Sequence, residues 1–279
     1  MLPIPAEETL PSYLYHYTSI QGVDGIIKSK AVWASELHFL NDSREWKFAL
    51  ELVRGEVLRA NGARPEKRWP ILLTRIADSL EQFSDMRVCV FCLSENPNQL
   101  SQWRGYCPPD GGYALQFKAD LLRDQLHAQG FQLHCCDYEF QSQRSKVREV
   151  VSAALQTVGW IPEEGHLEGI IQICLGELMK RLVPLAPFLK HPDFHEEAEW
   201  RAAKLVNTDD PAMGYHIRGP VAVPHALVHL DAVPGAFPIE DITVGPGPHQ
   251  QLASRGLAPI VFREGVRSIT ISQTPLREI

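Results

Sequence analysis

The run RVCVFCL at residues 87–93 carries the strongest strand signal in the chain. It is short and apolar, with valine and phenylalanine at its centre, and runs of this kind form strands that are buried on both faces. Two other short runs, residues 13–17 and 113–117, also favour a strand. The sequence therefore predicts a β core with residues 87–93 as a buried central strand.

Helices should surround this core. Residues 43–59 show the clearest helical repeat, because Trp46, Leu50, Val53 and Val57 recur three or four residues apart. Other helices are predicted at residues 19–29, 65–83, 119–128, 141–158 and 163–181. Other strands are predicted at residues 31–35, 131–139, 198–206, 226–230, 242–244, 260–262 and 268–271. This pattern indicates a mixed α/β chain of the α+β class, with helices packed around a mostly β core.

The composition changes after Asn207, where Pro, Gly and short β runs become frequent. We therefore expect a main α+β domain at residues 1–207. A β-rich C-terminal extension at residues 208–279 should pack on the same domain.

The overall composition limits the kinds of partner. The chain has 279 residues, a formal net charge of −7 and six cysteines. It has no apolar run near the roughly 20 residues that cross a bilayer, and its start lacks the features of a signal peptide. We therefore expect a cytoplasmic protein with reduced thiols and no membrane partner. The acidic balance disfavours general nucleic-acid binding.

Four separated segments carry polar residues that could act together. In the first, His16 lies within an aromatic strand, where its ring faces a cleft or bonds a backbone carbonyl at the edge of the core. In the second, Asp42 and Glu45 have the spacing of a capping box. Asn41 lies outside that box, which leaves its side chain freer for a ligand.

The third segment is the long loop predicted at residues 94–112. Long loops in compact domains are often functional. Trp103, Arg104 and Tyr106 could stack on a planar ring and hold an anion. The alternative is that Trp103 folds the loop back onto the core.

The fourth segment contains Glu197 and Glu199, which fall on one face if the strand predicted at residues 198–206 begins a residue early. Two carboxylates on one face repel each other, an arrangement that suits acid–base chemistry. The alternative is a solvated edge strand on which these glutamates pair with Arg201.

Metal and nucleotide motifs are weaker. Cys89 and Cys92 have zinc-knuckle spacing, but residues i and i+3 of a strand face opposite sides, so no metal is predicted. The chain has no P-loop, no dinucleotide fingerprint and no Gly-x-Ser-x-Gly motif.

The order of the motifs resembles the bacterial domain-of-unknown-function family twenty-nine seventy-one over nearly the whole chain. The motifs are residues 15–19, Trp33 with Ser35, residues 39–42 with Glu45, residues 91–94, 102–106 and 111–113, Lys190, residues 197–201, Ser272 and residues 275–277. More distantly, an early strand with His, a middle strand ending in Ser and a late Glu-x-Glu are similar to the ADP-ribosyltransferase superfamily. This similarity implies a central, mostly antiparallel sheet of that type and NAD as the substrate.

The same resemblance implies roles for the first three segments. His16, with Thr18 beside it, would anchor a ribose of NAD. Ser94 would line the nicotinamide pocket, and Tyr106 or Tyr113 would stack on the nicotinamide ring.

It also implies roles for the late glutamates. Glu199 would be the catalytic carboxylate that stabilises an oxocarbenium-like transition state. Glu197 would orient or deprotonate the acceptor. Asn41, Trp103 and Arg104 would add contacts to NAD.

The leading hypothesis is an NAD-consuming ADP-ribosyltransferase or NAD glycohydrolase, acting as a toxin or in defence against phage. Its acceptor is an unidentified macromolecule or small molecule, and nucleic acid enters only in that role. A second hypothesis is a non-catalytic sensor that binds a partner protein through residues 94–112. A third is a nuclease that uses His16, Asp42, Glu45 and Lys190.

Overall fold

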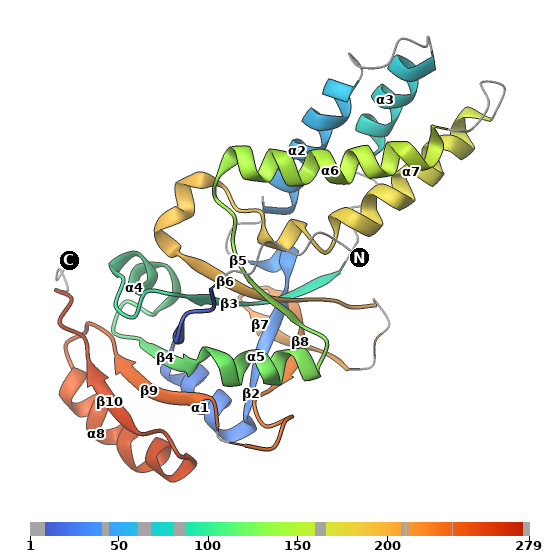
Figure 1. The fold of residues 1–279 in the computed structure, drawn as a ribbon. Coiled ribbons are helices and arrows are strands. Elements are labelled where there is room, and N and C mark those ends of the chain that lie inside the picture. Colours follow the sequence, from blue (N-terminus) through green and yellow to red (C-terminus); the bar gives the residue numbers. More distant parts are fainter. Residues whose placement is uncertain are drawn as a thin grey trace.

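The computed structural model describes residues 9–40, 45–60, 68–80, 87–159, 166–207, 210, 212–235 and 237–275. It has the predicted mixed α+β fold with a central, mostly antiparallel sheet, and only the β9–β10 pair is parallel among the paired strands described (Figure 1). The ten strands are β1 (Tyr13–Thr18), β2 (Ala31–Glu36), β3 (Val88–Ser94), β4 (Tyr113–Lys118), β5 (Gln132–Cys135), β6 (Glu199–Leu205), β7 (Met213–Arg218), β8 (Val221–His229), β9 (Ile239–Val244) and β10 (Ser268–Ile271).

Helices of different lengths connect these strands. The α-helices are α1 (Ile20–Ser29), α2 (Glu45–Arg59), α3 (Arg68–Ser79), α4 (Leu100–Tyr106), α5 (Ala119–Ala128), α6 (Phe140–Val158), α7 (Leu167–Leu182) and α8 (Gln250–Val261). Short 3₁₀ turns are η1 (Leu37–Phe39), η4 (Ala186–Phe188), η5 (Pro192–Glu197) and η6 (Phe262–Glu264).

Strand β3 is the branch point of the sheet. One of its edges pairs with β6 along the whole strand. The other edge is shared, because β2 pairs with Cys89 and Val90 while β1 pairs with Ser94 at the far end. Strands β1 and β2 therefore diverge, and no described strand pairs with the backbone around Cys92 on that edge. The sheet splits at this point.

The same strand is buried on both faces because its side chains alternate between two hydrophobic cores. Cys89, Phe91 and Leu93 belong to the core that α1, α5 and α8 cover. Val88 and Val90 belong to the other core, together with Ala203 of β6 and the remaining long helices. The prediction of a buried central strand is confirmed.

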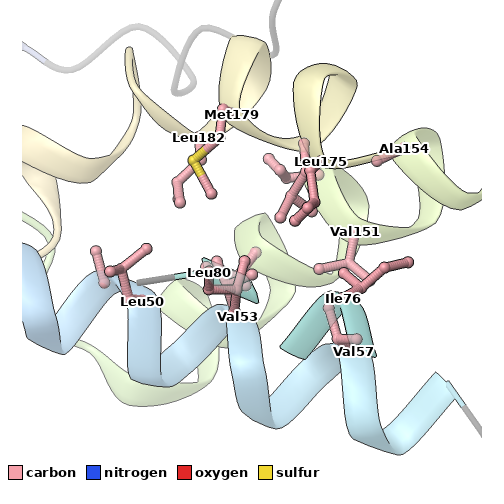
Figure 2. Packing of buried hydrophobic residues seen from close by; sticks show 14 of the residues in the cluster. Leu50, Val53, Val57, Ile76, Leu80, Val151, Ala154, Leu175, Met179 and Leu182 are labelled. Atoms are coloured by element: carbon pink, nitrogen blue, oxygen red, sulfur yellow. The ribbon is translucent and has the colours of Figure 1, made fainter. Parts of the chain in front are cut away.

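The second core continues into a helical arm formed by α2, α3, α6 and α7, which extends away from the sheet (Figure 1). Its interior is aliphatic: Figure 2 shows Val53 and Val57 of α2 on one side and Leu175 and Met179 of α7 on the other. Truncating a buried leucine to alanine in such a core costs about 2–5 kcal/mol. This packing holds α2 in place, and the first residue of α2, Glu45, reaches the candidate site.

The chain after residue 207 continues the main sheet. Strand β8 pairs with β2, β7 forms the edge beside β8, and β9 pairs with β4. The C-terminal segment, which begins with β7, therefore places strands at both ends of the sheet order.

Three sequence predictions differ from the structure. The loop predicted at residues 94–112 contains α4, whose Gln102 and Trp103 are buried. Residues 260–262 were predicted as a strand but lie in α8 and η6, because Leu257 and Val261, four residues apart, bury one helical face. Strand β7 was not predicted, although Met213, Tyr215 and Ile217 alternate with Gly214, His216 and Arg218 along it; none of its side chains is fully buried.

Within the described residues, no helix is both long and apolar enough to cross a lipid bilayer.

Candidate functional site

A cavity of about 430 Å³ opens where the sheet splits. Its size lies in the range of small-molecule sites. Strands β1, β2, β3 and β6 supply His16, Trp33, Cys92 and Glu199 to its wall. The start of α2, the end of α4 and the segment around η5 close the other sides. Four segments that are far apart in the sequence therefore meet at one cavity.

His16 occupies the split itself. Its Nδ1 lies 3.0 Å from the carbonyl oxygen of Cys92, on the edge of β3 that lacks a strand partner. A carbonyl can only accept, so Nδ1 carries the proton in this contact. Burial lowers the pKa of His16 below its ordinary value of 6.5, although the bond to Cys92 opposes this shift. The ring is therefore neutral near pH 7, and Nε2 is left as a hydrogen-bond acceptor.

Glu199 lies in a buried cluster of charges on the adjacent part of the wall. The Arg201 guanidinium donates to both of its carboxylate oxygens, with Nε and Nη2 each 2.9 Å away. The Lys190 ammonium donates to the same carboxylate. Glu199, Arg201 and Lys190 are each less than 5% exposed. This carboxylate is therefore held by two cations in a region that excludes water.

Glu45 joins the cluster from the arm. Its Oε1 accepts from Nη2 of Arg201 at 2.7 Å and lies 3.7 Å from Nζ of Lys190. Its Oε2 is buried and has no hydrogen-bond partner among the described residues. Three carboxyl groups, with Glu197 included, thus surround two cations, which leaves one formal negative charge in excess.

Glu197 is the more accessible of the two late glutamates. Its side chain is 16% exposed, against 5% for Glu199. Its Oε2 accepts from Nζ of Lys190 at 2.6 Å and from the hydroxyl of Tyr106 at 3.2 Å. Its Oε1 has no hydrogen-bond partner in the described part of the chain. Glu197 thus presents a free carboxylate oxygen at a residue that lines the cavity.

The ion pairs set the protonation states. Burial alone would raise the pKa of Glu199, but Arg201 and Lys190 outweigh burial and bring this pKa to about 2. Burial alone would lower the pKa of Lys190, but Glu199, Glu45 and Glu197 raise it above its ordinary value. Burial, and then the charge of Glu197, raise the pKa of Tyr106. Glu199 is therefore permanently ionised, and Tyr106 is a hydrogen-bond donor at neutral pH.

Other residues with predicted roles lie away from the cavity. Ser94 is buried; its hydroxyl donates to the Glu197 carbonyl at 2.7 Å and accepts from the Asn96 amide at 3.1 Å. Ser94 therefore shapes the turn before β6, beside the cavity wall. Tyr113 lines a separate cavity of about 270 Å³ near the start of α8. Thr18 borders neither of these two cavities.

Of the residues predicted in the third segment, one borders the cavity and two do not. Trp103 is buried, packs edge-on against Tyr17 and donates to Asn98 at 2.8 Å, so it folds α4 onto the core. Arg104 is exposed and does not border the 430 Å³ cavity. Tyr106, at the end of the same helix, does border it. Asn41 and Asp42 lie outside the described residues.

Trp33 and Arg218 are among the cavity residues that the sequence interpretation missed as site residues. Trp33 was recognised only as part of a motif, and Arg218 lies on β7, the strand that was not predicted. The small and apolar residues on either side of Trp33 gave no signal that its ring would border a cavity. Among the described residues, no group of three or more His, Cys, Asp or Glu side chains is arranged to hold a metal ion.

The family model described as "Protein of unknown function (DUF2971)" matches residues 102–202. This match confirms the family resemblance for the motifs within residues 102–202. The matched stretch runs from α4 to β6 and contains Tyr106, Lys190, Glu197 and Glu199. No curated protein matches the chain.

Proposed function

We propose that this chain, which carries the DUF2971 match, is an NAD-consuming enzyme of the ADP-ribosyltransferase or NAD glycohydrolase type. One observation carries the proposal: the imidazole of His16 and the carboxylates of Glu197 and Glu199 border the same cavity. The sequence pattern alone predicts these three side chains as site residues, although His16 lies more than 180 residues from the two glutamates. NAD consumption of this kind suits a toxin or a phage-defence effector.

His16 supplies a fixed hydrogen-bond acceptor. Its Nδ1 is held by the carbonyl of Cys92, which fixes the ring orientation and the tautomer. A ribose hydroxyl is a suitable donor to the remaining nitrogen, Nε2. The neutral ring also adds no positive charge where a cationic transition state would form.

The carboxylates of Glu197 and Glu199 have different roles at the ribose. Both oxygens of Glu199 are engaged by Arg201, and Oε2 also accepts from Lys190. Glu197 keeps one oxygen free and is oriented by Lys190 and Tyr106. We assign the direct contact with the ribose to Glu197. Glu199 acts as a positioning residue that holds Lys190 and adds a permanent negative charge.

The reaction breaks the bond between C1′ of the ribose and the nicotinamide nitrogen. The electron pair of that bond leaves with nicotinamide, and positive charge develops on C1′ and the ring oxygen. The excess negative charge of the cluster stabilises this charge in a site shielded from water. Water or an acceptor hydroxyl or amine then forms the new bond to C1′ and releases a proton to solvent or to a carboxylate.

The direct test is nicotinamide release from NAD. We expect Glu197→Gln to lower kcat about 10²–10³-fold, because the amide keeps the shape but removes the charge that the transition state needs. Glu199→Gln should lower it less, unless the loss of its charge displaces Lys190. Glu196→Gln is the matched control, since Glu196 is exposed and one residue away.

The proposal fails if the wild-type chain neither binds NAD nor releases nicotinamide when protein, single-stranded DNA, RNA and small amines are offered as acceptors. Equal rates for Glu197→Gln and Glu196→Gln would remove Glu197 from the reaction. Thermal unfolding must show that each variant is folded at the assay temperature.

A nuclease is the second candidate, because His16, Glu45 and Lys190 also border the cavity. A nuclease would need Lys190 to bind a phosphate of the nucleic acid. Lys190 is poorly available for this role, since it already donates to Glu197 and Glu199. Divalent-metal-dependent cleavage of RNA or DNA by the wild-type chain, lost in His16→Ala, would favour this candidate. Its absence, together with nicotinamide release, would exclude it.

A further inference from the structure

Trp33 borders the cavity on the opposite side of β3 from the charged cluster. It lies on β2, while Glu199 lies on β6, which pairs with the other edge of β3. Two strand spacings, about 10 Å, separate β2 from β6. The indole is 52% exposed although Trp33 lies in a paired strand. A large aromatic ring so exposed at a cavity calls for a physical explanation.

Two imidazoles cover one face of this indole. The ring of His216 stacks on it with a centroid distance of 4.5 Å and an interplanar angle of 18°, and His225 does so at 4.7 Å and 25°. The two imidazole centroids are only 5.4 Å apart. Rings on opposite faces of the indole would lie about 9 Å apart, the sum of the two stacking distances. Both histidines therefore lie on the same face, and no other ring of the described residues stacks on the indole.

The histidines hold the indole in a fixed orientation. Their Nδ1 atoms are 3.3 Å apart, so one ring donates to the other and at least one must be neutral. Burial lowers the pKa of both rings, helped by Arg218 for His216 and by His216 for His225. Neither histidine borders the cavity, whereas Trp33 does. The free side of Trp33 is thus the part that faces a ligand.

Arg218 borders the same end of the cavity. It lies on β7 beside β8, on the face of the sheet that also carries His216. One of its nitrogens donates to the carbonyl of Phe39, which anchors the side chain, and its charge helps burial to lower the pKa of His216, which stacks on Trp33. A guanidinium has five N–H donors, so donors remain for an anion such as a phosphate. We call the part of the cavity that Trp33 and Arg218 border the outer end, and the part with Glu197 and Glu199 the inner end. The outer end thus combines a supported aromatic face with an anchored cation.

We propose that this outer end is an adenine-nucleotide subsite, in which the base stacks on the face of Trp33 away from the histidines and a phosphate contacts Arg218. The inference deepens the proposed function, because it assigns the adenosine half of NAD to Trp33 and the nicotinamide half to the end with Glu197. A nucleotide offers a planar ring and an adjacent anion together, and the proposed reaction of NAD supplies such a ligand.

Calorimetric titration with AMP and ADP-ribose at pH 7.5 tests the subsite without any reaction. Trp33→Leu should weaken AMP binding about tenfold or more, because stacking on an aromatic side chain contributes that much per base. Trp33→Phe keeps an aromatic face and should change it less than threefold. Arg218→Gln should weaken AMP binding but leave adenosine binding unchanged.

Tyr215→Leu is the matched control, since Tyr215 is a highly exposed aromatic residue on the opposite face of the same sheet edge. The subsite is overturned if wild type binds neither AMP nor ADP-ribose, or if Trp33→Leu binds them as wild type does. AMP binding that depends on Trp33, without nicotinamide release from NAD, would retain the subsite and reject the proposed reaction. In an active enzyme, Trp33→Leu should raise KM for NAD and leave kcat nearly unchanged.

Discussion

The two ends of the cavity are built on opposite physical principles. At the inner end, Glu199, Arg201 and Lys190 are almost fully buried and are held together by ion pairs. At the outer end, Trp33 is half exposed and rests on two imidazoles with lowered pKa values. At the inner end, removing any one of these charged groups leaves another charge buried without a partner. The outer end is held by stacking.

This difference predicts how each end responds to substitution. Buried ions tolerate no loss of a partner, because the remaining charge stays desolvated. Stacked rings at a surface can be replaced with little effect on folding, since water takes their place. A variant at the inner end should therefore affect both stability and activity, whereas a Trp33 variant at the outer end should mainly affect ligand binding.

The largest expected effect is that of Arg201→Met. This substitution leaves Glu199 and Glu45 buried without their main cation, and it should lower the free energy of unfolding by about 3–5 kcal/mol. Urea denaturation measures this change. Arg263→Met is the control, because the Arg263 side chain is 78% exposed. A loss below about 1 kcal/mol for Arg201→Met would show that water reaches the cluster, and the contrast between the two ends would disappear.

The two ends of the cavity should also lose their contributions to stability over different pH ranges. Glu199 has a pKa of about 2 in the folded chain, below its ordinary 4.5, so its contribution is present above pH 4.5 and is lost as the pH falls towards 2. That loss is on the order of 3 kcal/mol. His216 and His225 have pKa values below 6.5, so the unfolded chain binds more protons and stability begins to fall below pH 6.5.

Unfolding free energies measured from pH 8 to pH 3 test whether the histidines lose their contribution at a higher pH than Glu199 does. The double variant His216→Gln, His225→Gln should lose less stability between pH 6.5 and 5 than wild type, and His16 accounts for part of the remainder. Its loss below pH 4.5 should be unchanged, because Glu199 keeps both cations. A wild-type profile that stays flat from pH 6.5 to 5 would contradict neutral histidines in the folded state.

The sequence was most informative where burial imposes a strict pattern. Residues 87–93 alternate into two cores, and this demand leaves a continuous apolar run that can be recognised. The helix predicted at residues 119–128 has the observed bounds of α5 for a similar reason, since Leu122 and Leu126 bury one face. His16 was found as a histidine within an aromatic strand, whereas Glu199 was found by its spacing from Glu197 and by the resemblance to the ADP-ribosyltransferase superfamily.

The details of the site depend on tertiary pairing, which local sequence does not encode. The split between β1 and β2 arises because both use one edge of β3, and no local pattern reports which edge a strand uses. Ser94 was predicted to line the pocket, but pairing with β6 turns its hydroxyl towards the Glu197 carbonyl. Arg218 was missed together with β7, although Met213, Tyr215 and Ile217 alternate along that strand, and no local pattern reports that an edge strand borders a cavity.

The smallest expected effect is that of Trp33→Leu on folding. The substitution removes two stacking contacts but opens no cavity in the core, because half of the indole surface is already in water. We expect the free energy of unfolding to fall by less than about 1 kcal/mol. Urea denaturation of Trp33→Leu beside Tyr215→Leu measures it. A loss of about 3 kcal/mol or more would mean that Trp33 is a structural residue, and its effect on nucleotide binding could then no longer be attributed to contact with the ligand.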